Sequence, residues 1–101
     1  MADTWSAEEN SAIVDAYFWM LSEETAGRPF VKSEVRRSLI AGKLSRRSEG
    51  AIERKFQNIS AVLDQHDLGF VDGYKPLRNY QSDLQSVVLD KLEALGVNLK
   101  Q

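Results

Sequence analysis

Two arginines and a serine in the middle of this chain have the types and spacing of an anion-binding site. Arg46 and Arg47 directly precede Ser48, and serine is among the residues that most often cap the N-terminus of a helix. The first turn of a helix leaves backbone N–H groups without intrahelical partners, and these groups attract anions. Two guanidinium groups beside such a turn therefore predict a site for a phosphate group.

Three polar residues farther along the same segment have side chains that can hydrogen-bond to the edges of nucleic-acid bases. They are Arg54, Gln57 and Asn58, which share one side of a helix. In the major groove of duplex DNA, arginine pairs with guanine, and glutamine or asparagine pairs with adenine. The alternative is an ordinary solvated face, on which Asn58 satisfies a loop carbonyl.

Charge is unevenly distributed along the chain, although the net charge of the 101 residues is only −2. Residues 1–26 carry six acidic side chains and no lysine or arginine, whereas residues 27–55 carry nine basic side chains against three acidic ones. A polyanion responds to the local field and not to the average. The sequence therefore predicts a basic patch over residues 28–55 that contacts phosphates. The predicted DNA-binding residues are Lys32, Arg36, Arg37, Lys43, Arg46, Arg47, Ser48, Arg54, Lys55, Gln57 and Asn58.

The residue types needed for catalysis are largely missing. The chain has no cysteine and a single histidine, His66, so the ligands of a zinc site and a Cys–His pair are lacking. Glu53-Arg54-Lys55 matches half of a metal-dependent nuclease motif, but on a helix Glu53 and Lys55 point roughly 200° apart. The six glycines are scattered and form no phosphate-binding loop. We expect no enzyme activity, no catalytic residue, no metal site and no cofactor.

Caps and apolar periodicity predict the elements that would position these residues. Ser6 and Glu9 have the spacing of a capping box at the start of a first helix, which we place at 7–24. A second, shorter helix is predicted at 32–41. It is expected to end at Gly42 in the left-handed conformation.

The third predicted helix has the strongest pattern. It covers about 49–65, begins after Ser48, and carries an apolar stripe at helical spacing for four turns. Residues 66–80 follow as a loop whose apolar side chains are expected to fasten it to the core. These side chains are Phe70, Val71 and Tyr74. A fourth helix at 81–95 is predicted to be capped by Asn79 or Ser82 and to stop at Gly96.

These elements predict a single all-α domain over residues 1–101. A trihelical core at 4–65 would be followed by the loop at 66–80 and a C-terminal helix at 81–95. About 100 residues is a common size for one domain. The order of long helix, short helix, short turn and long helix is that of helix-turn-helix variants, whose last helix lies in the major groove.

The sequence also resembles a known family. Trp5 followed by Ala7-Glu8-Glu9, and the string RSEGAIERKFQNI that begins at Arg47, are similar to Myb/SANT-type trihelical domains. In that family a tryptophan opens the first helix, and a helix of the pattern R-[ST]-x-x-[AQ]-[IV]-x-x-[KR]-[WF]-x-N reads DNA. The resemblance implies a homeodomain-like helix-turn-helix core with double-stranded DNA as its partner.

The resemblance extends to a bacterial and phage domain that precedes effectors in restriction and defence proteins. It covers residues 47–63, 73–76 and 79–81, and it implies an effector as partner, fused or separate. The chain departs from Myb repeats where these have further tryptophans, at positions occupied here by Val35, Leu39 and Phe56.

A protein-interaction or dimerisation module without direct DNA contact is the alternative. Some SANT domains carry acidic third helices and bind proteins, and Glu49 and Glu53 leave this reading open. The helix at 81–95 is a candidate face for a homodimer. No apolar run approaches the ~20 residues that span a bilayer, so we expect no membrane contact and a cytoplasmic protein. The resemblance implies that the protein is encoded by a bacterium or a phage.

Overall fold

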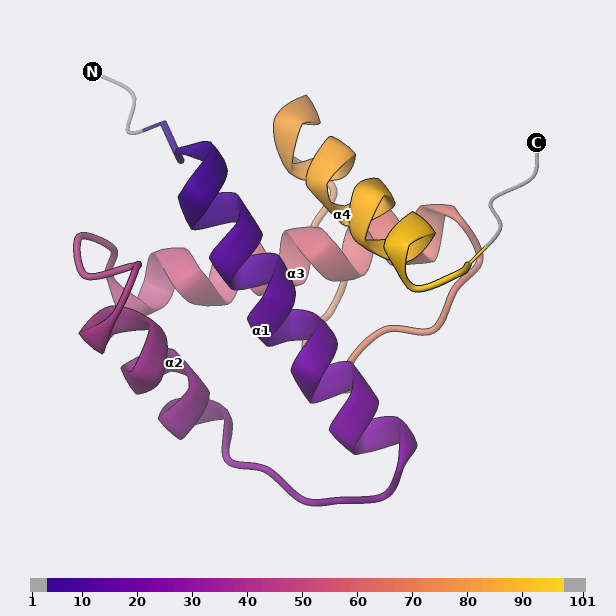
Figure 1. Ribbon diagram of the computed structural model, residues 1–101, viewed down its shortest axis with the longest axis horizontal. Helices are drawn as coiled ribbons and strands as arrows, with labels where there is room; N and C mark the ends of the chain where they lie inside the picture. The colour runs from indigo at the N-terminus through magenta and orange to yellow at the C-terminus, as the bar shows by residue number, and fades with distance from the viewer. Residues whose placement is uncertain (1–3, 98–101) are drawn as a thin grey trace.

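Four α-helices build the domain, and no strand occurs among residues 4–97, which the computed structural model describes. The helices are α1 (Ala7–Thr25), α2 (Lys32–Ala41), α3 (Glu49–Gln65) and α4 (Ser82–Ala94). Their bounds lie within one residue of those that the sequence predicts. The all-α class is therefore confirmed. Figure 1 shows α1 crossing α3, with α2 and α4 toward opposite ends of α3.

Local sequence chemistry sets most of the helix ends. The Ser6 side chain accepts from the Glu9 N–H, and the Glu9 carboxylate accepts from the Ser6 N–H, which completes the predicted capping box. Ser48 caps α3 by accepting from the Ala51 N–H. Gly96, at a φ of 84°, follows the end of α4. Because a positive φ strains residues with a Cβ, glycine suits this position.

Two predicted caps are wrong. Gly42 ends α2 with a φ of −116° and a ψ of −120°, so it is not in the left-handed conformation. The N-cap of α4 is Gln81, whose side chain makes no capping hydrogen bond, and neither Asn79 nor Ser82 takes that role. At the end of α2, after Gly42, the N–H of Leu44 donates to the Leu39 carbonyl and closes the turn there.

A cluster of aromatic rings joins α1, α3 and the loop. The Phe56 ring centroid lies 5.0 Å from that of Tyr74 and 6.1 Å from that of Tyr17. Val71 and Tyr74 are buried, which confirms the prediction that apolar side chains fasten the loop to the core. Offset and tilted ring pairs add to the stability gained from burying their area.

The phenol of Tyr17 ties the same three elements together by hydrogen bonds. Its oxygen lies 2.7 Å from the Ser60 hydroxyl and accepts from the Val71 N–H at 2.9 Å. Burial raises the pKa of Tyr17 to about 12, against the weaker lowering effect of these hydrogen bonds. The phenol is thus a neutral bridge inside the core, because a buried polar group needs partners to avoid a large desolvation penalty.

The loop between α3 and α4 covers part of the outer side of α3. The Leu77 N–H donates to the Gln57 carbonyl at 3.1 Å, and the Asn58 side-chain amide donates to the Leu77 carbonyl at 2.6 Å. Residues 58–63 are all buried as a result of this cover and of α1 and α4. The first two to three turns of α3 keep an open side, and exposed side chains recur in this helix at Asp64 and Gln65.

Helix α2 lies at the periphery. None of its ten residues is buried, although Val35, Leu39 and Ile40 pack partly against the core. Trp19 of α1 is 50% exposed. Its ring meets that of Phe30 edge-on at 6.0 Å.

Candidate functional site

Arg47 holds the N-terminal segment against the start of α3. Its guanidinium donates to both carboxylate oxygens of Glu9, at 2.6 and 2.9 Å, and to the Thr4 carbonyl at 2.9 Å. Its guanidinium carbon also lies 4.7 Å from the centroid of the Trp5 ring. Only 4% of the Arg47 side chain is exposed. This residue is therefore a structural clamp, and the predicted phosphate contact is corrected.

The carboxyl group of Glu9, the partner of Arg47, has a strongly lowered pKa. The hydrogen bond from Arg47 lowers the pKa of Glu9 to about 2, although burial of the carboxyl opposes the shift and the Ser6 N–H assists it. Glu9 therefore serves both the helix cap and the clamp. A carboxylate that accepts several charge-assisted hydrogen bonds is stabilised in its ionised form.

Two predicted phosphate-binding cations of α2 have partners within the fold. The guanidinium of Arg36 lies 3.5 Å from Glu53 and 3.9 Å from Glu49, both on α3. The ammonium of Lys32 lies 4.6 Å from the centroid of the Tyr74 ring. The Lys32 ammonium also occupies the space that a Cβ on Gly73 would need, and Gly73 has a φ of +92°. Both the occupied space and the positive φ favour glycine at this position.

Lys55 is half-buried beside the same tryptophan that Arg47 contacts. Its ammonium lies 4.6 Å from the centroid of the Trp5 ring. Burial lowers the pKa of this lysine, while the nearby Asp83 carboxylate opposes the shift. Such cation–π contacts stabilise a cation more when it has lost part of its hydration.

Four predicted cations remain exposed at the end of the molecule that holds the α2–α3 turn. They have no ion pair or hydrogen bond between their side chains and other residues in the range 4–97. They are Arg37, Lys43, Arg46 and Arg54. The basic patch predicted over residues 28–55 is thus smaller than expected, because its other members are drawn into the fold.

The two amide residues predicted to read bases, Asn58 and Gln57, also differ in whether the fold uses their side chains. Asn58 is 7% exposed and its amide nitrogen is bound to the Leu77 carbonyl, so the predicted base contact is corrected in favour of the loop-carbonyl alternative. Gln57 is half-buried, and its own contact with Leu77 uses the backbone carbonyl. The Gln57 side chain therefore stays available. The Ser48 hydroxyl is occupied as the helix cap.

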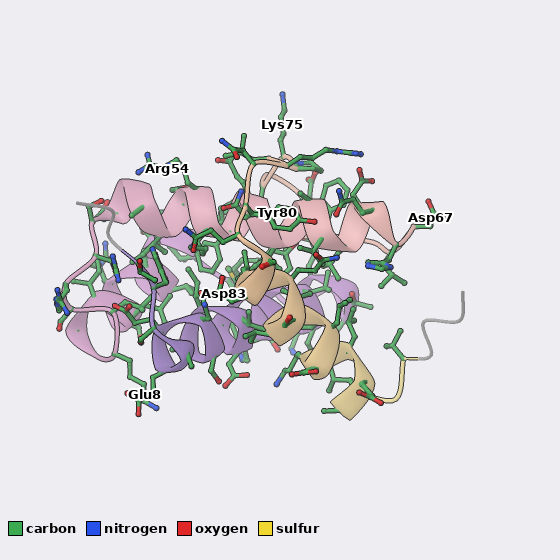
Figure 2. The ribbon with its side chains drawn as sticks, turned by 90° about the horizontal axis from the view of Figure 1, so that it is seen from above. Glu8, Arg54, Asp67, Lys75, Tyr80 and Asp83 are labelled. Atoms are coloured by element: carbon green, nitrogen blue, oxygen red, sulfur yellow. The ribbon has the colours of Figure 1, made fainter. Side chains whose placement is uncertain are left out.

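The loop contributes two further cations, Lys75 and Arg78, which are not among the predicted DNA-binding residues. Figure 2 shows Lys75 projecting from the same side of α3 as Arg54, the side that faces away from α1 and from Glu8. Arg78 of this loop pairs with Asp64 at 3.3 Å, and its side chain is 65% exposed. The helical periodicity that located the other candidates says nothing of loop residues. Their proximity follows from the hydrogen bonds of Leu77.

A small polar pocket opens beside these cations, with a volume of about 310 Å³. Its walls come from three segments: Trp5 ahead of α1, the outer side of α3, and the loop. The lining residues are Trp5, Ala51, Arg54, Lys55, Asn58, Leu77 and Asn79. Two cationic and two amide side chains thus meet around one concave surface.

Features of other functional classes are not found in the described part of the chain. No three His, Cys, Asp or Glu side chains within residues 4–97 gather closely enough to hold a metal ion. None of the helices there combines the length and apolar character that crossing a bilayer requires. His66 is the C-cap residue of α3, and its backbone N–H donates to the Leu63 carbonyl at 3.1 Å.

Comparisons of the chain with protein-family models, with curated proteins and with solved structures find no match. The Myb/SANT resemblance therefore rests on the residues quoted for it. The findings establish a compact all-α domain of four helices.

Proposed function

We propose that this domain binds duplex DNA through a basic surface formed by Arg37, Lys43, Arg46, Arg54 and Lys75. The observation that carries the proposal is the separation of the cations into two groups. Those beside acids or aromatic rings stabilise the fold, whereas these five are exposed and have no ion pair within residues 4–97. Unpaired cations on the surface of a domain attract a polyanion by releasing its counterions.

The start of α3 is the part of the domain best suited to enter a groove. Its first turns are open on the side away from α1, and Arg54 and Gln57 are the base-reading residue types that remain available there. Helix-turn-helix proteins also read bases with the N-terminal residues of the recognition helix. Because the loop covers the outer side of α3 from Asn58 onward, phosphate contacts would dominate the binding energy.

The salt dependence of DNA binding tests this proposal. Fluorescence anisotropy with a labelled random-sequence duplex, at several salt concentrations, gives the slope of log affinity against log salt. We expect Arg46→Ala to reduce that slope by about one, since one phosphate contact is lost. The matched control is Arg28→Ala, an exposed arginine that is paired with Glu23 at the far end of α1. Equal slopes for the wild-type protein and the Arg46 variant contradict the proposal.

Protein binding is a second candidate function, favoured by an open cleft between α1 and α2. The cleft has a volume of about 560 Å³, and Trp19 and Val31 in its lining are 50% and 51% exposed. Glu23 and Glu34 stand on its two walls. A large exposed aromatic residue is typical of the centre of a protein interface, and carboxylates on the walls favour a basic segment as partner.

Tryptophan fluorescence distinguishes the two candidates. A Lys-rich amphipathic peptide that binds the cleft shifts the emission of Trp19, and Trp19→Ala abolishes its binding without changing DNA affinity. If the peptide binds equally well to the Trp19 variant, the cleft is not the site.

A further inference from the structure

The pocket beside Trp5 brings together two kinds of binding group. Arg54 supplies an exposed guanidinium, and Lys55 supplies an ammonium that is already half-buried. Because Lys55 has lost part of its hydration, an arriving anion gains more from it than from a fully solvated lysine. The Trp5 ring, 4.6 Å from this ammonium, holds it at the pocket wall.

One of the two amide groups of the pocket is also fixed in place. Asn58 uses its nitrogen to donate to the Leu77 carbonyl, which leaves its oxygen as an acceptor without a protein partner in residues 4–97. Asn79 lies across the pocket on the loop. The pocket thus combines cations for an anionic group with an acceptor for a hydroxyl or amino group. A phosphate joined to a sugar and a base carries both kinds of group.

Charge and shape favour a terminal phosphate over an internal one. A phosphate monoester carries a charge of roughly −1.5 to −2 at neutral pH, which matches two cations. An internal phosphate of a duplex carries a single charge and is flanked by a sugar on either side. A concave pocket of about 310 Å³ therefore admits the end of a strand more readily than its middle.

We propose that the pocket formed by Trp5, Arg54, Lys55, Asn58 and Asn79 binds the phosphate monoester of a nucleotide. In its application to DNA the inference rests on the proposed function: the domain would then prefer duplexes whose strands end in a phosphate. A free nucleoside monophosphate offers the same chemistry and is the second source of the ligand.

Duplexes that differ only at their ends test the preference. Anisotropy measurements compare one labelled duplex with terminal phosphates, the same duplex with terminal hydroxyls, and a covalently closed duplex without ends. We expect the phosphorylated duplex to bind about tenfold (about 1.4 kcal/mol) more tightly than the other two, because the terminal phosphate gains hydrogen bonds to charged groups. Arg54→Gln should bring the ratio toward one. The control Arg28→Gln changes an exposed cation outside both the pocket and the proposed DNA-binding surface, and should leave the ratio intact.

A second readout reports on the pocket without DNA. Trp19→Phe leaves Trp5 as the sole tryptophan of the chain. Its fluorescence should change saturably with a nucleoside monophosphate and not with the nucleoside. Asn79→Ala, a change at an exposed loop residue, should weaken that response without unfolding the domain.

The possible results separate the two proposals. If the domain binds all three duplexes equally, the pocket proposal fails and the proposed function stands. If it binds no duplex, the proposed function fails, and the nucleotide titration alone decides on the pocket. A saturable, phosphate-dependent change then supports the pocket, and an unresponsive Trp5 overturns it.

Discussion

The guanidinium of Arg47 shows how a single side chain takes up several roles in this domain. It binds Glu9, the Thr4 carbonyl and the Trp5 ring, and so joins the start of α1 to the cap of α3. The sequence places Arg47 beside Arg46 and suggests a common function. The Glu9 carboxylate binds Arg47, whereas Arg46 is exposed and has no ion pair within residues 4–97.

Glu9→Gln should destabilise the domain by about 2–3 kcal/mol, because Arg47 loses its charged partner. Glutamine can still accept from the Ser6 N–H, so the helix cap remains. Chemical denaturation measures the loss. Glu8→Gln, one residue away and exposed, is the control and should have little effect. A loss of equal size in both variants would contradict the clamp.

The same pair makes stability fall in acid. The folded-state pKa of Glu9 is about 2, below the ordinary value of 4.5, so the unfolded chain takes up the proton first. The stabilising contribution is present above pH 4.5 and is lost as the pH falls toward 2. Denaturation midpoints measured across this range should converge for the wild-type protein and Glu9→Gln. A difference that persists at pH 2 would argue against this linkage.

Tyr17→Phe should cost about 1–3 kcal/mol, since the Val71 N–H and the Ser60 hydroxyl both lose a buried partner. Thermal unfolding measures the change. The size of the ring is unchanged, so the loss reports the hydrogen bonds and not a cavity. An unaltered melting temperature would mean that water replaces the phenol.

Among the elements, α3 is central, and its two halves have different surroundings. Its first turns lie beside the exposed cations, whereas its second half is enclosed by α1, α4 and the loop. The helix itself was predictable, because Ser48 caps it and apolar residues recur at helical spacing. The position of the loop over α3 was not predictable. Hydrogen bonds of Leu77 hold the loop there, and the apolar periodicity of the sequence does not indicate them.

We expect Asn58→Ala to lower the stability of the domain and Gln57→Ala to lower its affinity for DNA. Loss of the Asn58 amide frees the loop, and we expect faster hydrogen exchange over residues 71–80 and a loss of about 1 kcal/mol. Gln57 binds the loop through its backbone, so Gln57→Ala should leave stability intact. In the proposed interface it should instead cost roughly 1–3 kcal/mol on one preferred DNA site. The account is contradicted if Gln57→Ala loosens the loop.

In the molecule as a whole, the opposite charges of the chain largely neutralise one another across helix contacts. Glu9 pairs with Arg47, Glu53 pairs with Arg36, and Asp15 pairs with Lys91. The segregation of charge along the sequence thus becomes a set of links between elements. Of the cations within residues 4–97, those without an ion pair or a ring contact include Arg37, Lys43 and Arg46 near the α2–α3 turn. Linear charge counts overestimate such a surface, because they cannot tell which cations meet a carboxylate in space.

Amide chemical shifts during a titration with duplex DNA test the proposed surface most directly. We expect the perturbed amides to cluster at residues 37, 43–50, 54, 57, 75 and 77–79, while those around Trp19 and Val31 stay unchanged. Shifts confined to the α1–α2 cleft, or no shifts at any DNA concentration, would contradict it.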